Sequence, residues 1–193
     1  MKIYQQEQID EVVAALNACA VVTVPTETVY GLAVKYDNVA AIDKLMRIKD
    51  RDYDSGKVFT LMLSDADQIK DFAVLDDLAR KIAEKYFPGE LTLVLSKNPK
   101  LHNPYFDHFD TIGIRIPNHR FMLNLLVKSG PLIVTSANLA GLNPAVDSGA
   151  ISGTVPGIDA VVAGWAGEHA PSTVAKVQGE RVTILRQGDL KIS

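Results

Sequence analysis

Apolar residues recur every three or four positions in four stretches of the chain, a spacing typical of helices with one buried face. The stretches cover residues 9–16, 39–46, 78–86 and 121–126. Their flanks agree with this interpretation, because Asp76 and Asp77 precede the third stretch, Pro88 and Gly89 follow it, and Asn118 is placed to cap the fourth. The pattern therefore predicts four amphipathic helices.

Short apolar runs rich in β-branched residues lie between and after these helices, as expected for buried strands. The runs are Ala20–Val24, Phe59–Leu63, Leu91–Leu95, Ile112–Ile116, Leu132–Thr135, Ala160–Ala163, Thr173–Val177 and Val182–Leu185. Helix and strand alternate early and strands dominate the end, which predicts an α/β (α+β) fold with helices packed on a mixed sheet. The Gly-, Pro-, Ser- and Asn-rich stretch 141–157 is expected to be a long irregular loop, and residues 1–193 a single domain.

Composition narrows the class of protein. A single cysteine, Cys19, excludes an internal disulfide framework and any paired-cysteine metal or redox motif. The first ten residues lack a signal-peptide pattern, and no apolar segment reaches the ~20 residues of a membrane helix, which favours a cytoplasmic protein without a membrane partner. The 20 Lys and Arg residues against 23 Asp and Glu give a net charge of −3, which argues against nucleic-acid binding through bulk charge.

Familiar catalytic motifs are missing from the sequence. It contains no GxxxxGK[ST] phosphate loop, no GxGxxG fingerprint and no GxSxG elbow, and its four histidines lack metal-ligand spacing. Polar residues instead follow predicted strands, as Thr26 and Thr28 do after the first and Ser136 and Asn138 do after the fifth. Such residues either bind a polar ligand at the strand ends or make ordinary turns by bonding the backbone.

Cationic residues allow a similar pair of interpretations. Lys49 and Arg51 end the second predicted helix, where they either complement the helix dipole or form a site for phosphate or carboxylate. Arg115 alternates with Ile114 and Ile116, so it faces the other side of its strand, either in solvent or against a buried anion. From the residues alone, the prediction stops at an anion-binding α/β domain.

Seven blocks of sequence, taken together and in order, resemble the threonylcarbamoyl-AMP synthase family, the YrdC-type domain in its short single-domain form. The resemblance covers nearly the whole chain. The blocks are Val24-Pro25-Thr26-Glu27-Thr28-Val29-Tyr30-Gly31-Leu32, Lys49-x-Arg51, Pro88-Gly89-x-Leu91-Thr92-Leu93-Val94-Leu95, Ile114-Arg115-Ile116-Pro117, Ser136-Ala137-Asn138-x-x-Gly141, Ser172-Thr173-Val174 and Ile184-Leu185-Arg186-x-Gly188.

The resemblance implies a concave, twisted mixed parallel/antiparallel sheet with flanking helices around a large polar cavity. It also implies an L-threonylcarbamoyladenylate synthase, a nucleotidyltransferase that condenses L-threonine, bicarbonate and ATP into threonylcarbamoyl-AMP and pyrophosphate. The adenylate would feed a tRNA-modifying transferase complex that forms threonylcarbamoyladenosine. Mg²⁺ is expected to enter with ATP, held by phosphate oxygens and water, so no metal-ligating side chains are expected.

Site residues carry over from the matching blocks. The family pattern gives Lys49 and Arg51 the catalytic role of facing the triphosphate and the reacting carboxylates. It implies further ATP contacts at Lys57, Thr111, Ser136, Asn138 and Arg186. It implies threonine contacts at Thr28, Arg115 and Ser172, with Arg115 as the partner of the threonine carboxylate.

Two loops depart from the family pattern. Residues 52–58 read Asp-Tyr-Asp-Ser-Gly-Lys-Val, which is longer than the usual segment and lacks its proline, so the register of Lys57 is open. Glu90 replaces the usual proline of the Pro-Gly-Pro-Leu-Thr block. Because the chain ends soon after Gly188, it is also expected to lack the extra C-terminal domain of the family's long form.

Two alternative functions stay open. The first is a non-enzymatic YrdC-like protein that binds tRNA, rRNA or double-stranded RNA in a basic groove, and the net charge of −3 counts against it. The second is a paralogue that acts on a different carbamoylation substrate, for which the altered loop at residues 52–58 is the only support.

Overall fold

A computed structural model of the chain describes residues 1–53, 59–138, 147–149, 151, 155–167 and 170–193. In this part of the chain, ten strands form one mixed sheet. The strands are β1 (Lys2–Tyr4), β2 (Val22–Val24), β3 (Gly31–Lys35), β4 (Thr60–Met62), β5 (Leu91–Ser96), β6 (Thr111–Arg115), β7 (Leu132–Ser136), β8 (Ala160–Val162), β9 (Thr173–Gln178) and β10 (Arg181–Arg186). The helices are α1 (Ile9–Asn17), α2 (Val39–Ile48), α3 (Ile69–Phe72), α4 (Asp77–Tyr86) and α5 (Arg120–Ser129), with short 3₁₀ turns at Ala66–Gln68 and Phe106–His108.

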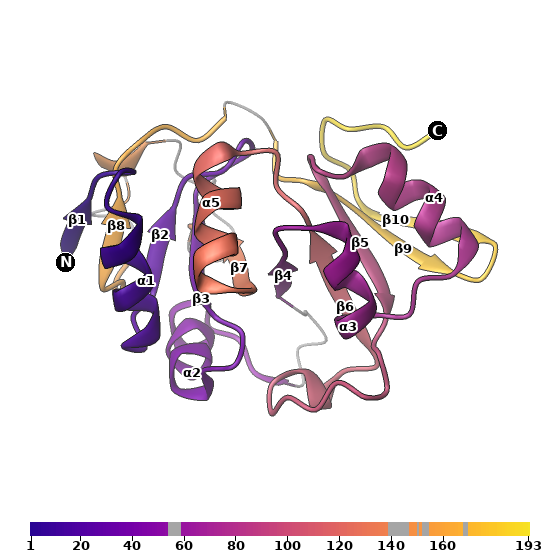
Figure 1. The fold of residues 1–193 in the computed structure, drawn as a ribbon, viewed down its shortest axis with the longest axis horizontal. Helices are drawn as coiled ribbons and strands as arrows, with labels where there is room; N and C mark the ends of the chain where they lie inside the picture. The colour runs from indigo at the N-terminus through magenta and orange to yellow at the C-terminus, as the bar shows by residue number, and fades with distance from the viewer. Residues whose placement is uncertain (54–58, 139–146, 150, 152–154, 168–169) are drawn as a thin grey trace.

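The strand order is β1-β8-β2-β3-β7-β4-β6-β5-β9-β10. The pairs β1–β8, β2–β8, β4–β6 and β5–β9 are parallel, and the other pairs are antiparallel. Figure 1 shows α1 beside β1, β8 and β2 at one end of the molecule, and α4 beside β5, β9 and β10 at the other. The prediction of a mixed sheet with flanking helices is confirmed.

Side-chain alternation along the strands divides the apolar core. On β5, Leu91, Leu93 and Leu95 are buried in the larger core cluster, to which α2, α3 and α4 contribute their apolar faces. The intervening Thr92 and Val94 point to the opposite side, where they line a cavity. A second cluster buries the apolar faces of α1 and α5 against β2, β7 and β8. Over its β5–β6–β9 region, the side of the sheet opposite α3 and α4 thus lines a cavity.

The predicted helices begin and end close to their expected positions, and one cap differs. The side chain of Asp76 accepts a hydrogen bond from the Ala79 amide at 2.8 Å, which starts α4. At α5 the cap is His119 rather than Asn118, since His119 Nδ1 accepts from the Met122 amide at 3.4 Å. The Asn118 amide instead donates to Glu27 Oε1 at 2.8 Å. The prediction that Asn118 caps α5 is therefore wrong by one residue.

Some elements and segments lie outside what the apolar pattern predicted. Strand β1, strand β3 and the single turn α3 were not among the predicted elements. Most of the predicted loop at 141–157 falls outside the described residues. None of the helices in the described part of the chain is long and apolar enough to cross a membrane.

Candidate functional site

A cavity of about 500 Å³ opens on the polar face of the sheet. Its walls come from β3 to β7, from β9 and β10, and from the segments that follow β2 and α2. Seven of the residues predicted for substrate binding line this one cavity: Thr28, Arg51, Thr111, Arg115, Ser136, Ser172 and Arg186. Residues up to 158 positions apart in sequence therefore share one concave site.

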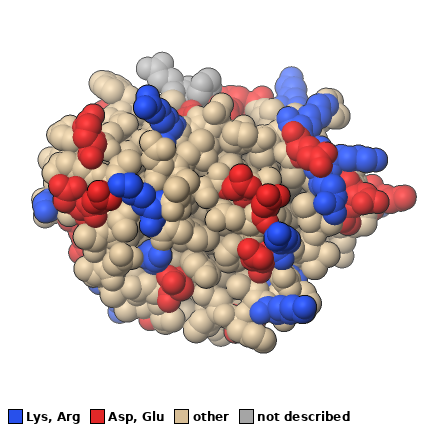
Figure 2. Space-filling view, in the orientation of Figure 1, with Lys and Arg blue, Asp and Glu red and all other residues tan. Residues whose placement is uncertain are grey.

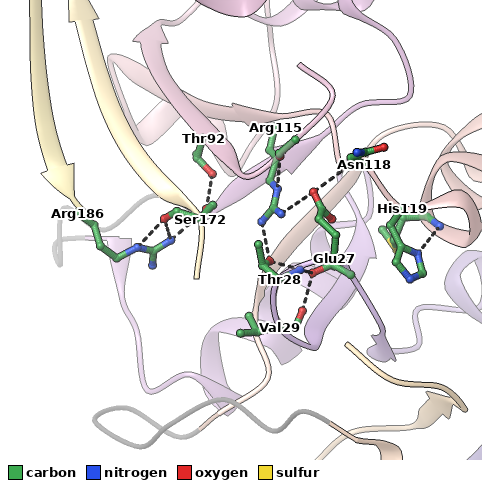
Figure 3. A network of polar contacts seen from close by, with 12 residues as sticks. Glu27, Thr28, Val29, Thr92, Arg115, Asn118, His119, Ser172 and Arg186 are labelled. Atoms are coloured by element: carbon green, nitrogen blue, oxygen red, sulfur yellow. Dashed lines mark hydrogen bonds and ion pairs between the residues drawn. The ribbon is translucent and has the colours of Figure 1, made fainter. Parts of the chain in front are cut away.

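Arg115 is the most constrained cation of the cavity. Its side chain is buried, and its Nε donates to the Gly89 carbonyl at 3.1 Å while Nη1 donates to Thr28 Oγ1 at 3.0 Å. Its Nη2 lies 2.8 Å from Glu27 Oε1, a close ion pair whose geometry is not that of a hydrogen bond. Figure 3 shows Glu27 and Thr28 beside this guanidinium, with Asn118 bonded to Glu27. The sequence left open whether Arg115 is exposed or paired, and the structure shows it buried with an acidic partner.

The donor in the hydrogen bond between the Thr26 and Thr28 hydroxyls can be assigned from the neighbouring contacts. Thr26 Oγ1 donates to the Val29 carbonyl at 2.7 Å and accepts the Thr28 amide at 3.2 Å. Since the single hydroxyl proton of Thr26 is used in this way, the 3.0 Å contact between the two hydroxyls has Thr28 as its donor. Thr28 Oγ1 therefore meets Arg115 and the cavity only as an acceptor. The turn expected for this segment is present, and the two threonines also border the cavity.

Ser172 and Arg186 are joined on the opposite wall. Arg186 Nε and Nη2 donate to the Ser172 carbonyl at 3.0 and 2.8 Å, and Nη2 also contacts Ser172 Oγ at 3.1 Å. The Ser172 hydroxyl lies 2.9 Å from that of Thr92, which is buried on β5 (Figure 3). Burial lowers the pKa of Arg186, and the nearby charge of Arg115 lowers it further. The two guanidinium groups thus repel each other across the site.

Lys49 sits beside the cavity, bonded to its rim. The side chain is buried, and Nζ donates to the Ser136 carbonyl at 2.9 Å and to Asn138 Oδ1 at 3.0 Å. Burial lowers the pKa of Lys49 to about 8, and the charge of Arg51 contributes in the same direction. The Ser136 hydroxyl in turn donates to Asn138 Oδ1 at 2.6 Å. The Lys49 and Ser136–Asn138 blocks of the sequence therefore form one contact network.

Arg51 and Thr111 occupy the wall formed by the end of α2 and the start of β6. The Arg51 guanidinium lies 4.8 Å from the centre of the Phe59 ring, a cation–π arrangement. Burial lowers the pKa of Arg51 from its usual value. Thr111 starts β6, and Phe59 immediately precedes β4, its parallel neighbour. Lys57, predicted to contact ATP, lies outside the described residues.

Charge is distributed unevenly in this cavity. Four cationic side chains line it, from Arg51, Arg115, Lys176 and Arg186, and the described lining holds no carboxylate. An excess of positive charge on low-dielectric walls favours a polyanionic ligand. The phosphates of a nucleotide meet that requirement, and guanidinium groups bind them in a bidentate manner.

Among the residues of the site that sequence reasoning missed are Glu27, Phe59, Thr92 and Lys176. Glu27 and Thr92 stand inside blocks that carry the family resemblance, whereas Phe59 and Lys176 stand outside them, and each is buried or partly buried. The alternation of side chains along β9 could have indicated Lys176. It lies on the same face as Val174, whereas the buried Thr173, Ala175 and Val177 lie on the other face. No comparable signal marks Glu27, since its role depends on a partner 88 residues away.

In the described residues, no three of the His, Cys, Asp and Glu side chains are grouped so as to hold a metal ion. The polar side chains among the described residues that line the cavity are hydroxyls and cations.

Comparison with known proteins identifies the class that this fold and site define. A family model described as "Telomere recombination", and named for Sua5, YciO and YrdC, matches residues 14–188. The chain therefore belongs to the Sua5/YciO/YrdC family.

Relatives by sequence carry names that refer to one activity. A protein of Methanocaldococcus jannaschii, provisionally named a threonylcarbamoyl-AMP synthase, is 32% identical over 169 residues, which cover 86% of this chain and 79% of that protein. The Mus musculus threonylcarbamoyl-AMP synthase is 37% identical over 135 residues, or 69% of this chain. The match spans only 47% of the mouse protein.

Solved structures agree on the fold. P. abyssi Sua5 in its H234A/Y235A form is 25% identical with a TM-score of 0.88, and the match covers 97% of this chain and 60% of Sua5. P. abyssi Sua5 has also been solved with L-threonine. E. coli YciO, at 24% identity and a TM-score of 0.88, matches over 98% of this chain and 97% of its own length. The YrdC-like fold expected from the sequence is thus confirmed.

Proposed function

We propose that the protein is a threonylcarbamoyl-AMP synthase, which condenses L-threonine, bicarbonate and ATP into threonylcarbamoyl-AMP and pyrophosphate. The observation that carries the proposal is the pairing of Arg115 with Thr28 at one wall of a cavity that is otherwise rich in cations. A guanidinium beside an acceptor-only hydroxyl suits an amino acid, since the guanidinium takes the carboxylate and the hydroxyl oxygen accepts from the ammonium or side-chain hydroxyl.

The remaining cations suit the nucleotide. Arg51 and Arg186 line the same cavity as Arg115 and have no carboxylate partner among the described residues, so their charge is available for phosphate oxygens. Lys49 donates hydrogen bonds to Ser136 and Asn138 and so holds this segment at the rim of the cavity. In the proposed complex, the triphosphate lies beside this rim. Mg²⁺ would enter as part of the ATP substrate and neutralise phosphate charge there.

The chemistry requires positioning and charge neutralisation more than a covalent nucleophile. The amine of threonine attacks the carbon of bicarbonate, and loss of water leaves a carbamate. A carbamate oxygen then attacks the α-phosphorus of ATP and pyrophosphate leaves. In this scheme Arg115 and Thr28 hold the amino acid, while Arg51 and Arg186 stabilise the charge that develops on the phosphates.

The test is an activity assay on the purified protein with ATP, Mg²⁺, labelled bicarbonate and L-threonine. We expect threonine-dependent pyrophosphate release and labelled threonylcarbamoyl-AMP, both lost in the R115M variant. The matched control is D10N, which removes a carboxylate from the exposed Asp10–Lys128 ion pair far from the cavity. If the wild-type protein forms no labelled adenylate, or if R115M matches wild type, the proposal fails.

Transfer of the adenylate to tRNA would require a partner transferase complex in the cytoplasm. Direct RNA binding gains no support from the face of the molecule in Figure 2, where lysine and arginine side chains are interspersed with aspartate and glutamate. The other alternative, a different carbamoylation substrate, is separated in the same assay by replacing L-threonine with serine, alanine or other amino acids.

A further inference from the structure

Glu27 stands directly behind Arg115 and does not itself line the cavity. One of its carboxylate oxygens, Oε1, contacts both Arg115 Nη2 and the Asn118 amide, each at 2.8 Å. The other oxygen, Oε2, is buried and has no hydrogen-bond partner among the described residues. The side chains of Glu27 and Arg115 are 15% and 5% exposed. A glutamate this deeply buried is costly unless its charge is used.

The contacts of Arg115 show what Glu27 adds. The Gly89 carbonyl and the Thr28 hydroxyl already accept from Nε and Nη1, so two nitrogens of the planar guanidinium are fixed without Glu27. The third nitrogen, Nη2, is the one that faces the carboxylate. Glu27 therefore completes the orientation of the group and places a negative charge next to it.

That charge changes which ligand Arg115 prefers. The other cations that line the cavity have no carboxylate partner among the described residues, and Arg186 is close enough to Arg115 for their charges to repel. Without Glu27, Arg115 would be a further free cation and would compete for phosphate. With Glu27, the Glu27–Arg115 pair carries no net charge, so it has no net attraction for a polyanion. A zwitterion, which also carries no net charge, is therefore less disfavoured at this pair than a polyanion is.

We propose that Glu27 is a positioning and specificity residue that reserves Arg115 for the carboxylate of a zwitterionic amino acid and keeps phosphate groups off it. This inference rests on the proposed function, because it takes the amino-acid substrate as given. It goes further in assigning a discriminating role to a residue that touches no substrate. The same cavity must hold a triphosphate and an amino acid at once. In this proposal Glu27 keeps the triphosphate away from Arg115, which then binds the carboxylate of the amino acid.

The experiment measures L-threonine binding by calorimetry in wild type, E27Q and E27D, each with and without inorganic phosphate as the competing probe. In wild type, phosphate is expected to leave threonine affinity unchanged within a factor of about two, since charge coupling is local. In E27Q, threonine affinity falls about tenfold and phosphate becomes competitive with threonine. E27D keeps the negative charge but, with its shorter side chain, holds it farther from Arg115. We therefore expect E27D to bind threonine more weakly than wild type, without competition from phosphate.

The D10N variant is the matched control, because Asp10 also loses an ion pair but lies far from the cavity. Its threonine affinity and phosphate response should equal those of wild type. Thermal unfolding of each variant shows whether the protein remains folded, and E27D provides the comparison if E27Q does not fold. A merely structural glutamate would weaken threonine binding in E27Q without creating phosphate competition.

Several outcomes overturn the inference. It is wrong if E27Q binds threonine as wild type does, if its weaker binding is indifferent to phosphate, or if a folded E27D is indistinguishable from wild type. Failure of the proposed function has a different signature, because the wild-type protein itself would then form no labelled adenylate. The two failures are therefore separated by the activity assay on the wild-type protein, run beside its threonine titration.

Discussion

The ammonium of Lys49 lies 2.9 Å from the carbonyl oxygen of Ser136, which joins the end of α2 to the end of β7. This contact ties together two sequence blocks that are 87 residues apart. Because Nζ also donates to Asn138 Oδ1, the rim of the cavity depends on a charged lysine whose acceptors are a carbonyl and an amide rather than a carboxylate.

The first prediction concerns the pH dependence of ATP binding. Burial lowers the pKa of Lys49 to about 8, so the side chain loses its proton as the pH rises through that value. Neutral lysine has one donor fewer and no charge for phosphate, and we expect ATP affinity to fall between pH 7 and 9. ATP titration at a series of pH values measures this. In K49M the affinity should be lower throughout and flat across the range.

A control is required because the pKa of Tyr86 is lowered to about 8 by its hydrogen bonds with Ser193. Tyr86 lies at the end of α4 and does not line the cavity. The Y86F variant should therefore keep the wild-type pH profile of ATP binding. An equally steep decline in K49M would show that another group is responsible.

The second prediction separates geometry from charge at Arg186. Its Nε and Nη2 both donate to the Ser172 carbonyl, a fork that lysine cannot reproduce. We expect R186K to weaken ATP binding by about 1–3 kcal/mol, because it leaves the charge but loses the bidentate contact. The matched control is R181K on the exposed start of the same strand, which should bind ATP normally. Equal ATP affinities in wild type and R186K would contradict the prediction.

The third prediction concerns Thr28, whose hydroxyl accepts from Arg115 and donates to Thr26. In T28V, Arg115 Nη1 loses its acceptor while staying buried, and such a loss costs about 1–3 kcal/mol. We expect weaker threonine binding and a lower melting temperature. T28S keeps the hydroxyl and should restore both to near wild type. Calorimetry and thermal unfolding of the two variants test this prediction. If T28S is as impaired as T28V, the hydroxyl is not the group that supports threonine binding and stability.

The fourth prediction concerns close backbone packing at Gly188. A Cβ placed there would lie 2.4 Å from the Pro171 carbonyl oxygen and 2.8 Å from the Thr173 amide nitrogen. Since both are backbone atoms, the segment after β10 would have to move away from the segment that carries Ser172. We expect G188A to destabilise the protein by about 2 kcal/mol or more and to weaken ATP binding.

Gly113 supplies the contrast to Gly188. Its Cβ would make an ordinary 3.4 Å contact with Thr92 Cγ2, so G113A should unfold close to the wild-type temperature. Thermal unfolding of the two variants side by side tests the difference. A G188A protein as stable as G113A would show that the backbone there yields easily.

Much of the fold could be predicted from the pattern of apolar residues, because the helices bury one face and several strands are short, continuous apolar runs. Strand β3 escaped because Gly31–Lys35 follows the Thr26–Thr28 turn closely, and no polar or turn-forming run marks where the strand begins. Strand β1 is only three residues long, and two of them, Lys2 and Ile3, are exposed, so no alternation marks it. Strand order was not predictable either, since β8 enters between β1 and β2 from far along the chain.

The candidate site was predictable only in part from the residue types. Ends of strands marked Ser136, Ser172 and Arg186, and the resemblance joined them into one site that the structure gathers around a single cavity. Contacts between distant side chains gave no local signal. Nothing near Glu27 in sequence indicates Arg115, and their ion pair forms only because β6 ends beside the turn after β2.

The insertion of β8 between β1 and β2 also has a consequence for the order in which the protein is made. Among the strands that the structure describes, β1 pairs only with β8, so Lys2–Tyr4 cannot join this sheet until residue 160 has been synthesised. At the other end, β5 meets β9 only after residue 173. A nascent chain therefore carries unpaired strand edges on β1 and β5 until these later residues emerge. The cavity takes walls from β9 and β10, so it is complete only after residue 186 has been synthesised.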